Sequence, residues 1–514
     1  MRVLITASGL QDYIFNISHR AASTRLRGRS ARLGLILDCC LSRFQERFGS
    51  EFDTNRDIRR NSGTRLELEF AQAPAGLESF LAELQHALDQ HSLRDLDGQV
   101  WFAVAAADGR REAYGRLAKA KLRMGQRAIK DGADSEKAQW NEANFLFHPQ
   151  VNERGIGKTE ASVLPEAEFG QDLARSNNKY VHFTSLGGKH GIPVLDAFAK
   201  AAEEDPGEGF RLGLTEVTQT GDPKLLRKRV ARHAPLGGHG RLLDFDEIAD
   251  RAAGAKFLGL LKADMDSLGS TFSKFGSDGK GERQSRELSA KLEVLFTDEL
   301  EGLVKTTFAD CYIVYSGGDD LFMLGPWDQL IRFTAAFQAL LRRSVESWGY
   351  PQLTLSAAYK VAHPKSPVRH LAEDIEAALE AAKKHRKSGE KDPHKNCICI
   401  FERVVAWDEL REGLEWANRF MNGANSQGLS TAFLQRFQYY ADQFHRFFDR
   451  KQVEGLRAVP LLQNDWLRNV ERIQDPLRSQ LGNVWPHLVE PTDTGARMWR
   501  VLEFASRFAV YALR

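Results

Sequence analysis

Apolar and polar positions along the first 140 residues predict a short series of strands and helices. Residues 61–70 pass from the small residues Ser62 and Gly63 into alternating polar and apolar positions, which predicts a β-hairpin. The predicted elements are strand 1–7, a basic helix at 20–36, the hairpin, helix 77–88 and strand 100–104. This β-α-β-β-α-β order is typical of a ferredoxin-like domain.

A similar pattern returns between residues 251 and 405. The apolar run at 257–263 is typical of a buried strand, and two further apolar runs flank the turn at Gly317 and Gly318. The predicted elements are strand 257–263, helix 286–305, strands 311–315 and 321–324, helix 330–348, strand 353–359, helix 367–384 and strand 396–401. This order is ferredoxin-like with one addition, which is the palm arrangement of polymerases and nucleotide cyclases.

The rest of the chain has a different texture. Residues 141–250 are rich in glycine and short polar segments and give no compact pattern, whereas residues 406–514 are helical with a stripe of aromatic residues that predicts the core of a small bundle. A chain of 514 residues exceeds one ordinary core. We therefore predict an α+β protein with a first palm at 1–140, a linking domain at 141–250, a second palm at 251–405 and a helical domain at 406–514.

The two palms look like copies of one another. The segment that begins at Thr6 matches the one that begins at Asp264, and the turn at Gly63 matches the turn at Gly317. The intervals agree, because Thr6 and Gly63 are 57 positions apart and Asp264 and Gly317 are 53 apart. Every acidic position of the second copy is replaced in the first, so we expect one active and one degenerate palm.

Acidic residues stand at the two places where a palm supplies metal ligands. Asp264 and Asp266 end a strand, and Asp319 and Asp320 follow the glycine turn. Nucleotidyl transfer needs Mg²⁺ or Mn²⁺ to offset the charge of a triphosphate, and such ions prefer carboxylate oxygens. We predict Asp264, Asp319 and Asp320 as catalytic metal ligands. Asp264 and Asp266 share one face of their strand, whereas the adjacent Asp319 and Asp320 would point oppositely on a regular strand, so Asp264 and Asp319 rank first, Asp320 next and Asp266 last.

The residues around these acids suit a nucleotide. Gly317 and Gly318 permit a tight hairpin and leave room for a base or ribose, and Ser316 precedes them. The amides of Ser267, Leu268 and Gly269, where the strand turns into a helix, could hold phosphate. Lys383, on the last turn of a palm helix, could reach the triphosphate, whereas the other basic residues up to Lys391 fit a solvated helix end.

Net charge, apolar runs and cysteines restrict the class of protein further. The net charge of +2 is close to balance, so contact with RNA is expected to be local or shared with partner subunits. No apolar run is long enough for a membrane helix, and the first residues do not fit a signal peptide. The five cysteines include no Cys-x-x-Cys pair, and Cys397 and Cys399 fit one face of a buried strand. We expect a cytoplasmic protein without a structural zinc site.

These motifs together resemble a known family, the large polymerase-containing subunit of type III CRISPR effector complexes. The resemblance rests on the opening motif at 9–15 with its continuation at 26–30, on the segments 263–269 and 315–320, and on Ala382 and Lys383. It implies an enzyme that joins ATP into cyclic oligoadenylate when the complex captures target RNA. The implied site has metal on Asp264, Asp319 and Asp320, phosphate on Lys383, and nucleotide against Gly317 and Gly318.

The resemblance also implies partners and two departures. The partners would be other subunits of the complex, the guide RNA and the target RNA. Many members carry an N-terminal His-Asp nuclease domain, but this sequence has no His-Asp dipeptide and begins at the palm, so we expect no cleavage of single-stranded DNA. Many members also carry a four-cysteine zinc site between the palms, and residues 141–250 contain no cysteine.

Two alternatives remain at this stage. The chain could be a scaffold that binds RNA and partner subunits without catalysis, although intact acids in the second palm argue against this. It could also be a stand-alone cyclase or dinucleotide synthase that works as a homodimer. The degenerate first palm disfavours the homodimer, because two palms in one chain remove the need for a second chain.

Overall fold

A computed structural model describes most of the chain. It covers residues 1–121 with short gaps between 16 and 110, four short strands between 180 and 227, and residues 233–514 except 239–240, 276–278, 318, 386–394 and 491. Two compact units emerge. The first comprises Met1–Phe245, Leu268–Leu321 and Lys365–Ala372, and the second comprises Asp246–Ser267, Phe322–Pro364 and Glu373–Arg514. The bounds of the four predicted domains stay a prediction. Gly63, Gly318 and most of the basic segment 20–36 lie outside the described residues.

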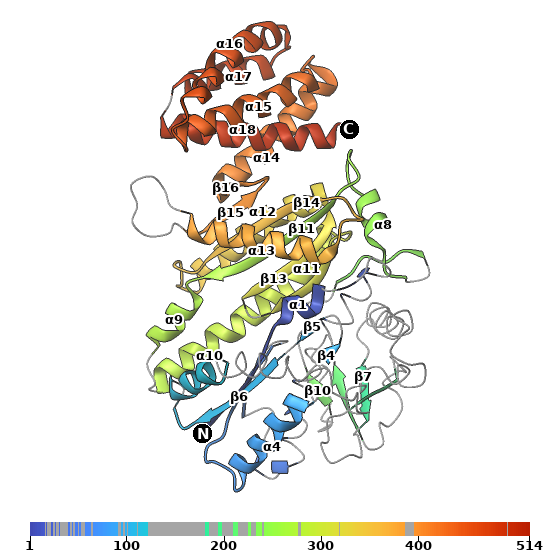
Figure 1. Cartoon of the computed structure of the whole chain (residues 1–514), viewed down its shortest axis with the longest axis vertical. Coiled ribbons are helices and arrows are strands. Elements are labelled where there is room, and N and C mark those ends of the chain that lie inside the picture. Colours follow the sequence, from blue (N-terminus) through green and yellow to red (C-terminus); the bar gives the residue numbers. More distant parts are fainter. Residues whose placement is uncertain are drawn as a thin grey trace. The chain divides into compact units, whose positions relative to one another are not determined.

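The first unit contains the sheet of the predicted first palm (Figure 1). Its strand order is β2-β3-β1-β6, with β1 at Arg2–Ser8, β2 at Ile58–Ser62, β3 at Arg65–Glu69 and β6 at Trp101–Ala107. Neighbouring strands are antiparallel. Helix α1 (Leu10–Phe15) follows β1, and α4 (Leu77–Gln90) follows β3. The short strands β4 (Arg94–Asp95) and β5 (Gly98–Gln99) pair with each other before β6. The hairpin, the helix at 77–88 and the strand at 100–104 are thereby confirmed.

The region predicted as a linking domain contains a second small sheet. Its order is β10-β9-β7-β8, with β7 at Tyr180–Thr184, β8 at Val194–Ala197, β9 at Gly209–Gly213 and β10 at Leu225–Arg227. The apolar and polar pattern of residues 141–250 did not predict these strands, because each is only three to five residues long. A strand of that length carries too few alternations to stand out from a loop.

The second palm has a six-stranded sheet with the order β12-β13-β11-β14-β15-β16. Its strands are β11 (Leu258–Asp266), β12 (Tyr312–Gly317), β13 (Asp320–Pro326), β14 (Thr354–Ala362), β15 (Cys397–Ile400) and β16 (Arg403–Ala406). Its first four strands repeat the order of the first palm, with β11 in the place of β1. This agreement in topology supports the two segments being copies, and the α+β palm fold is confirmed.

The helices of the second palm differ from the prediction in one respect. The predicted helix 286–305 is longer and interrupted: α10 (Gly279–Val294) passes through a π-helical turn η4 (Leu295–Glu299) into α11 (Leu300–Thr307). Helices α12 (Trp327–Ser347) and α13 (Val368–Lys384) lie within two or three residues of their predicted bounds. Strand β16 was not predicted, because four residues carry too few alternations to stand out. It follows a turn in which Phe401 and Glu402 have positive φ.

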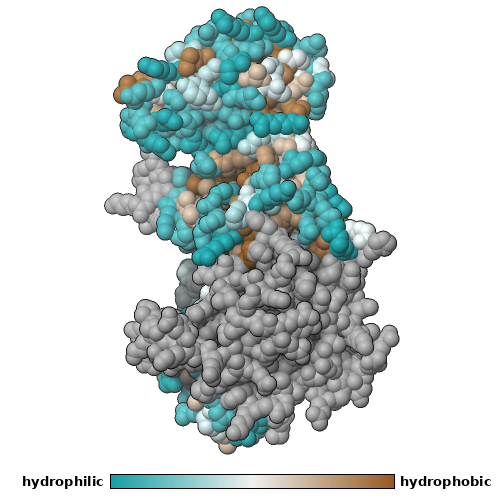
Figure 2. All heavy atoms as spheres, turned by 45° about the vertical axis from the view of Figure 1, so that its right-hand side comes forward, coloured by the Kyte–Doolittle hydropathy of each residue, from teal (hydrophilic) through white to brown (hydrophobic). Residues whose placement is uncertain are grey.

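Five helices make up the predicted C-terminal bundle. They are α14 (Trp407–Ser426), α15 (Thr431–Phe448), α16 (Ala458–Asn469), α17 (Leu477–Val489) and α18 (Asp493–Ala512). The aromatic stripe of α15 is buried at Phe433, Phe437, Tyr440 and Phe444, which confirms its core role, whereas Tyr439 is exposed. In the space-filling view the outer face of these helices is mostly hydrophilic with small apolar areas (Figure 2). No helix of the described residues is long and apolar enough to cross a membrane.

A buried charge cluster joins β16 to the bundle. The carboxylate of Glu503 on α18 lies 3.4 Å from the Arg403 guanidinium, 3.2 Å from that of Arg507 and 3.4 Å from Nε2 of His445 on α15. Nδ1 of His445 lies 3.3 Å from Asp449. Burial alone would lower the pKa of His445, but the two carboxylates outweigh it and raise that pKa above its usual 6.5. Protonation of His445 therefore favours its contacts with Glu503 and Asp449.

The raised pKa makes the stability of the bundle depend on pH. The contribution of protonated His445 is fully present below pH 6.5, the value of an unperturbed histidine, and is lost as pH rises through the higher folded pKa. The urea midpoint of tryptophan fluorescence should therefore fall above pH 6.5. His445→Gln should cost about 1–3 kcal/mol at pH 6 and flatten this dependence. His487→Gln, at an exposed position of α17, should behave as the wild type; an unchanged pH profile in His445→Gln would contradict the assignment.

Candidate active site

The end of β11 brings two of the predicted acids against β14. The strands are antiparallel, with Asp264 opposite Ser356 and Asp266 opposite Thr354. Alternate residues of a strand share a face, so Asp264 and Asp266 point the same way. Their surroundings nevertheless differ, because the neighbouring side chains of β14 bond to only one of them.

Asp266 is a buried structural carboxylate. Its side chain accepts hydrogen bonds from Thr354 Oγ1 and Ser356 Oγ, each at 2.9 Å, and from the backbone N–H of Asn396 at 3.0 Å. Only 2% of Asp266 is exposed, and burial raises its pKa despite these donors. Asp266 thereby ties β11 to β14 and to the residue that precedes β15. This position fits its last place in the predicted ranking of metal ligands.

Asp264 instead forms an ion pair with Lys383, which was predicted to bind the triphosphate. Nζ of Lys383 lies 2.7 Å from Oδ2 of Asp264, and the two side chains are 26% and 21% exposed. The residues stand at opposite ends of the palm sequence, one on β11 and one on the last turn of α13. Folding thus brings together a predicted metal ligand and a predicted phosphate ligand, and solvent reaches both.

Two further ion pairs hold α13 over the same face of the sheet. Lys262, nearly buried on β11, pairs with Glu376, and Lys360 on β14 pairs with Asp374. In both pairs the strand carries the cation and the helix carries the anion. At Asp264 the polarity reverses, because the strand carries the anion. The candidate site lies at this reversed ion pair between Asp264 and Lys383.

The glycine hairpin carries the remaining acids. Ser316 donates its hydroxyl to the carbonyl of Phe296 in the π-helical turn at 2.5 Å, and the N–H of Asp319 donates to the carbonyl of Gly317 at 3.0 Å. A side chain placed at Gly317 would meet nothing within 4 Å. The space at the Cβ position of Gly317 is therefore open, whereas the Ser316 hydroxyl is already engaged in holding the turn. Asp319 and Asp320 are half-buried.

The turn after β11 is strained. Ser267 has φ of 63°, a left-handed conformation that a residue with a side chain seldom adopts. Leu268 is buried, so only its backbone could contact a ligand. A side chain placed at Gly269 would meet nothing within 4 Å. The helix that follows, α9 (Leu268–Lys274), is short. Phosphate binding by Ser267, Leu268 and Gly269 stays a prediction.

The described residues do not bring all predicted metal ligands into one cluster. Among the side chains that the structure describes, no three His, Cys, Asp or Glu residues group in a way that could hold a metal ion. In the sheet order β13, which begins at Asp320, is the neighbour of β11, which carries Asp264. The metal assignment of Asp264, Asp319 and Asp320 stays a prediction.

Residues 257–393 match a family of known domains, described as Cas10/Cmr2, second palm domain. This segment is therefore similar to the second palm domain of Cas10/Cmr2. The matched segment starts beside β11 and extends past α13, so it includes Asp264, the glycine hairpin and Lys383. The resemblance to the large subunit of type III CRISPR complexes, first seen in these motifs, is confirmed.

Curated relatives agree with this assignment. The Cas10/Csm1 protein of Thermococcus onnurineus, named a single-strand-specific deoxyribonuclease of the subtype III-A CRISPR system, is 25% identical over 425 residues, which are 73% of this chain and 52% of the relative. The protein of the same name from Mycobacterium tuberculosis is 22% identical over 78% of this chain and 54% of its own length. The chain thus spans about half the length of the curated relatives it matches.

Solved structures share the fold. The crystal structure of an apo Csm1–Csm4 cassette matches with a TM-score of 0.70 and 17% identity, covering 100% of this chain and 70% of that one. A Csm1–Csm4 cassette in complex with one ATP matches with a TM-score of 0.69 and 18% identity over the same shares. At identities of 17% and 18% the likeness concerns the fold alone.

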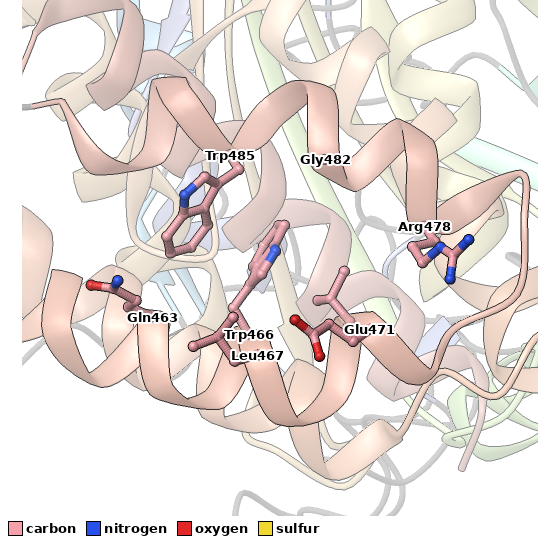
Figure 3. A pocket seen from close by; sticks show the side chains of 8 residues that line it. Gln463, Trp466, Leu467, Glu471, Arg478, Gly482 and Trp485 are labelled. Carbon is pink, nitrogen blue, oxygen red and sulfur yellow. The ribbon is translucent and has the colours of Figure 1, made fainter.

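The C-terminal bundle contains a separate pocket (Figure 3). It has a volume of about 330 Å³ and lies between α16 and α17. The indole rings of Trp466 and Trp485, which face into it, lie 4.8 Å apart between centroids. None of the residues predicted from the sequence lines this pocket.

Several residues that shape the site were missed from the sequence. Thr354 and Ser356 hold Asp266, and Glu376 neutralises Lys262. One signal was available: Lys262 interrupts the apolar run 257–263, and a lysine in a buried strand needs an acidic partner. The sequence did not indicate which acid of α13 would serve.

Asp264 and Asp266 offer a matched pair of variants. Asp266→Ala should lower the unfolding free energy of the palm by about 2–4 kcal/mol, because two hydroxyls and one N–H lose a buried acceptor. Asp264→Ala should cost about 1 kcal/mol or less, because its ion pair is partly exposed. Denaturant unfolding of both variants would measure the difference. Equal losses would contradict the structural role of Asp266.

Proposed function

We propose that this chain is a nucleotidyltransferase that converts ATP into cyclic oligoadenylate when a type III CRISPR complex binds target RNA. The observation that carries the proposal is the juxtaposition of Asp264 and Lys383 at the end of β11, in a Cas10 palm that also carries the hairpin acids. Csm1–Csm4 cassettes solved with ATP, with cA3 and with cA4 support the choice of substrate and product class.

The chemistry of the proposed donor set, three carboxylates, suits a divalent metal. Mg²⁺ and Mn²⁺ take carboxylate oxygens, and Asp264, Asp319 and Asp320 provide them on a partly exposed strand end and on the glycine turn. Asp266 is excluded from this set, because its carboxylate oxygens already accept hydrogen bonds from Thr354, Ser356 and Asn396. When bound, the metal offsets triphosphate charge and lowers the pKa of the attacking hydroxyl.

The chain's own residues then position the nucleotide. Lys383 is proposed to bind the triphosphate as a point charge, and the open space at Gly317 admits the base or ribose. Asp266 holds the end of β11 in place, so the carboxylate of Asp264 keeps a fixed position. Preorganised charges of this kind stabilise a phosphoryl transition state without further rearrangement.

The proposed setting is a complex with other CRISPR subunits in the cytoplasm. Csm4 is the partner in the solved cassettes that share this fold, which supports a partner of that kind here. The near-neutral net charge of +2 favours contact with guide and target RNA through the complex rather than along a long basic surface.

One alternative is a non-catalytic RNA-binding scaffold, and another is a stand-alone dinucleotide cyclase. The intact acids of the second palm speak against the scaffold, because the same positions of the first palm have lost them. The two sheets of like strand order in one chain speak against a homodimeric cyclase. The mass of the native particle and the presence of nucleotide products discriminate among the three.

The hairpin acids give the direct test. Purified complex with cognate target RNA, ATP and Mg²⁺ or Mn²⁺ should form oligoadenylate, measured by chromatography. Asp319→Ala combined with Asp320→Ala should reduce the rate on the order of 10²-fold or more, because charge stabilisation of the transferred group is lost. Binding of target RNA and thermal stability should persist. Unchanged product formation would contradict the metal assignment.

A further inference from the structure

The ion pair of Lys383 with Asp264 neutralises two groups that the proposed function requires in charged form. The distance of 2.7 Å between Nζ and Oδ2 is that of a charge-assisted hydrogen bond. A carboxylate oxygen bonded to an ammonium is a poor ligand for a divalent cation, because the cation must first displace the ammonium. An ammonium bonded to a carboxylate is likewise less attractive to phosphate.

Breaking this pair would leave helix α13 in place. Its apolar stripe of Ile375, Leu379 and Ala382 is buried. The pairs of Lys262 with Glu376 and of Lys360 with Asp374 anchor it to β11 and β14 independently of Lys383. The pair with Asp264 therefore contributes little to the position of the helix. Its two charges are also 26% and 21% exposed, so ions and nucleotides can reach them.

On the basis of the function proposed above, we propose that Lys383 competes with divalent metal for Asp264 until a triphosphate draws the lysine away, so that metal and nucleotide load together. A triphosphate gives the ammonium a new anionic partner, and Asp264 is then free to bind the cation. Conversely, a cation on Asp264 releases Lys383 for the triphosphate. Such coupling is reciprocal, since each ligand changes the affinity of the other by the same factor.

The neighbouring lysine provides a matched control. Lys384 is the next residue of α13, but it pairs with Glu380 of the same helix at 2.9 Å and is 75% exposed. Replacing Lys383 or Lys384 by Met removes one positive charge from the same turn and keeps a similar side-chain length. A difference between the two variants therefore reports on the pair with Asp264 rather than on net charge.

The test uses the full chain and Mn²⁺, whose free ion is measured by electron paramagnetic resonance. Titrations are run alone and with an ATP analogue that has a methylene bridge between the α- and β-phosphorus atoms. For the wild type, the analogue should tighten Mn²⁺ binding. Lys383→Met should bind Mn²⁺ about five-fold more tightly without nucleotide, which is the upper range for a partly exposed pair. It should also bind the analogue more weakly and lose the coupling.

Two variants complete the design. Lys384→Met should behave as the wild type, and Lys383→Arg should still compete with Mn²⁺, because the guanidinium keeps the charge. Equal Mn²⁺ affinity of the wild type, Lys383→Met and Lys384→Met would overturn the competition but leave the proposed metal site standing. Absence of Mn²⁺ binding in every variant, with or without the analogue, would overturn the proposed metal site itself and the competition with it.

Discussion

The pairing of β11 with β14 is the constraint on which the candidate site depends. It extends over nine residue pairs and fixes which side chain of β14 lies opposite each residue of β11. Because Thr354 and Ser356 stand at the end of that ladder, they bind Asp266 and leave Asp264 to Lys383. A shift of the register by one residue would exchange the two faces of the strand and remove both arrangements.

Helix α13 adds the second layer of this construction. Its buried apolar residues pack against the sheet. Its acidic residues Glu376 and Asp374 pair with Lys262 and Lys360 of the strands. The reversal of polarity at Asp264 therefore takes place on a scaffold that is already anchored. Because β11 and α13 are held by other contacts, Asp264 and Lys383 keep their positions when the ion pair between them is broken.

Much of the fold followed from hydrophobic periodicity. The palm order and the hairpin were predicted because each element is long or is bounded by glycine, whereas the three- to five-residue strands of the linking sheet were not. Of the site, Asp264 and Lys383 were predicted from their places at the ends of elements, and their direct contact was not. A period of two puts Asp264 and Asp266 on one face, and only the side chains across the sheet distinguish them.

The four strands of the first sheet have the same order as four of the six strands of the second, and Thr6 of β1 stands where β11 carries Asp264. In an assembly of two identical chains, any substitution would appear in both halves at once. A duplication within one polypeptide removes this restriction, since each half can change without the other. The first half can therefore carry Thr6 and Ser8 where the second carries Asp264 and Asp266.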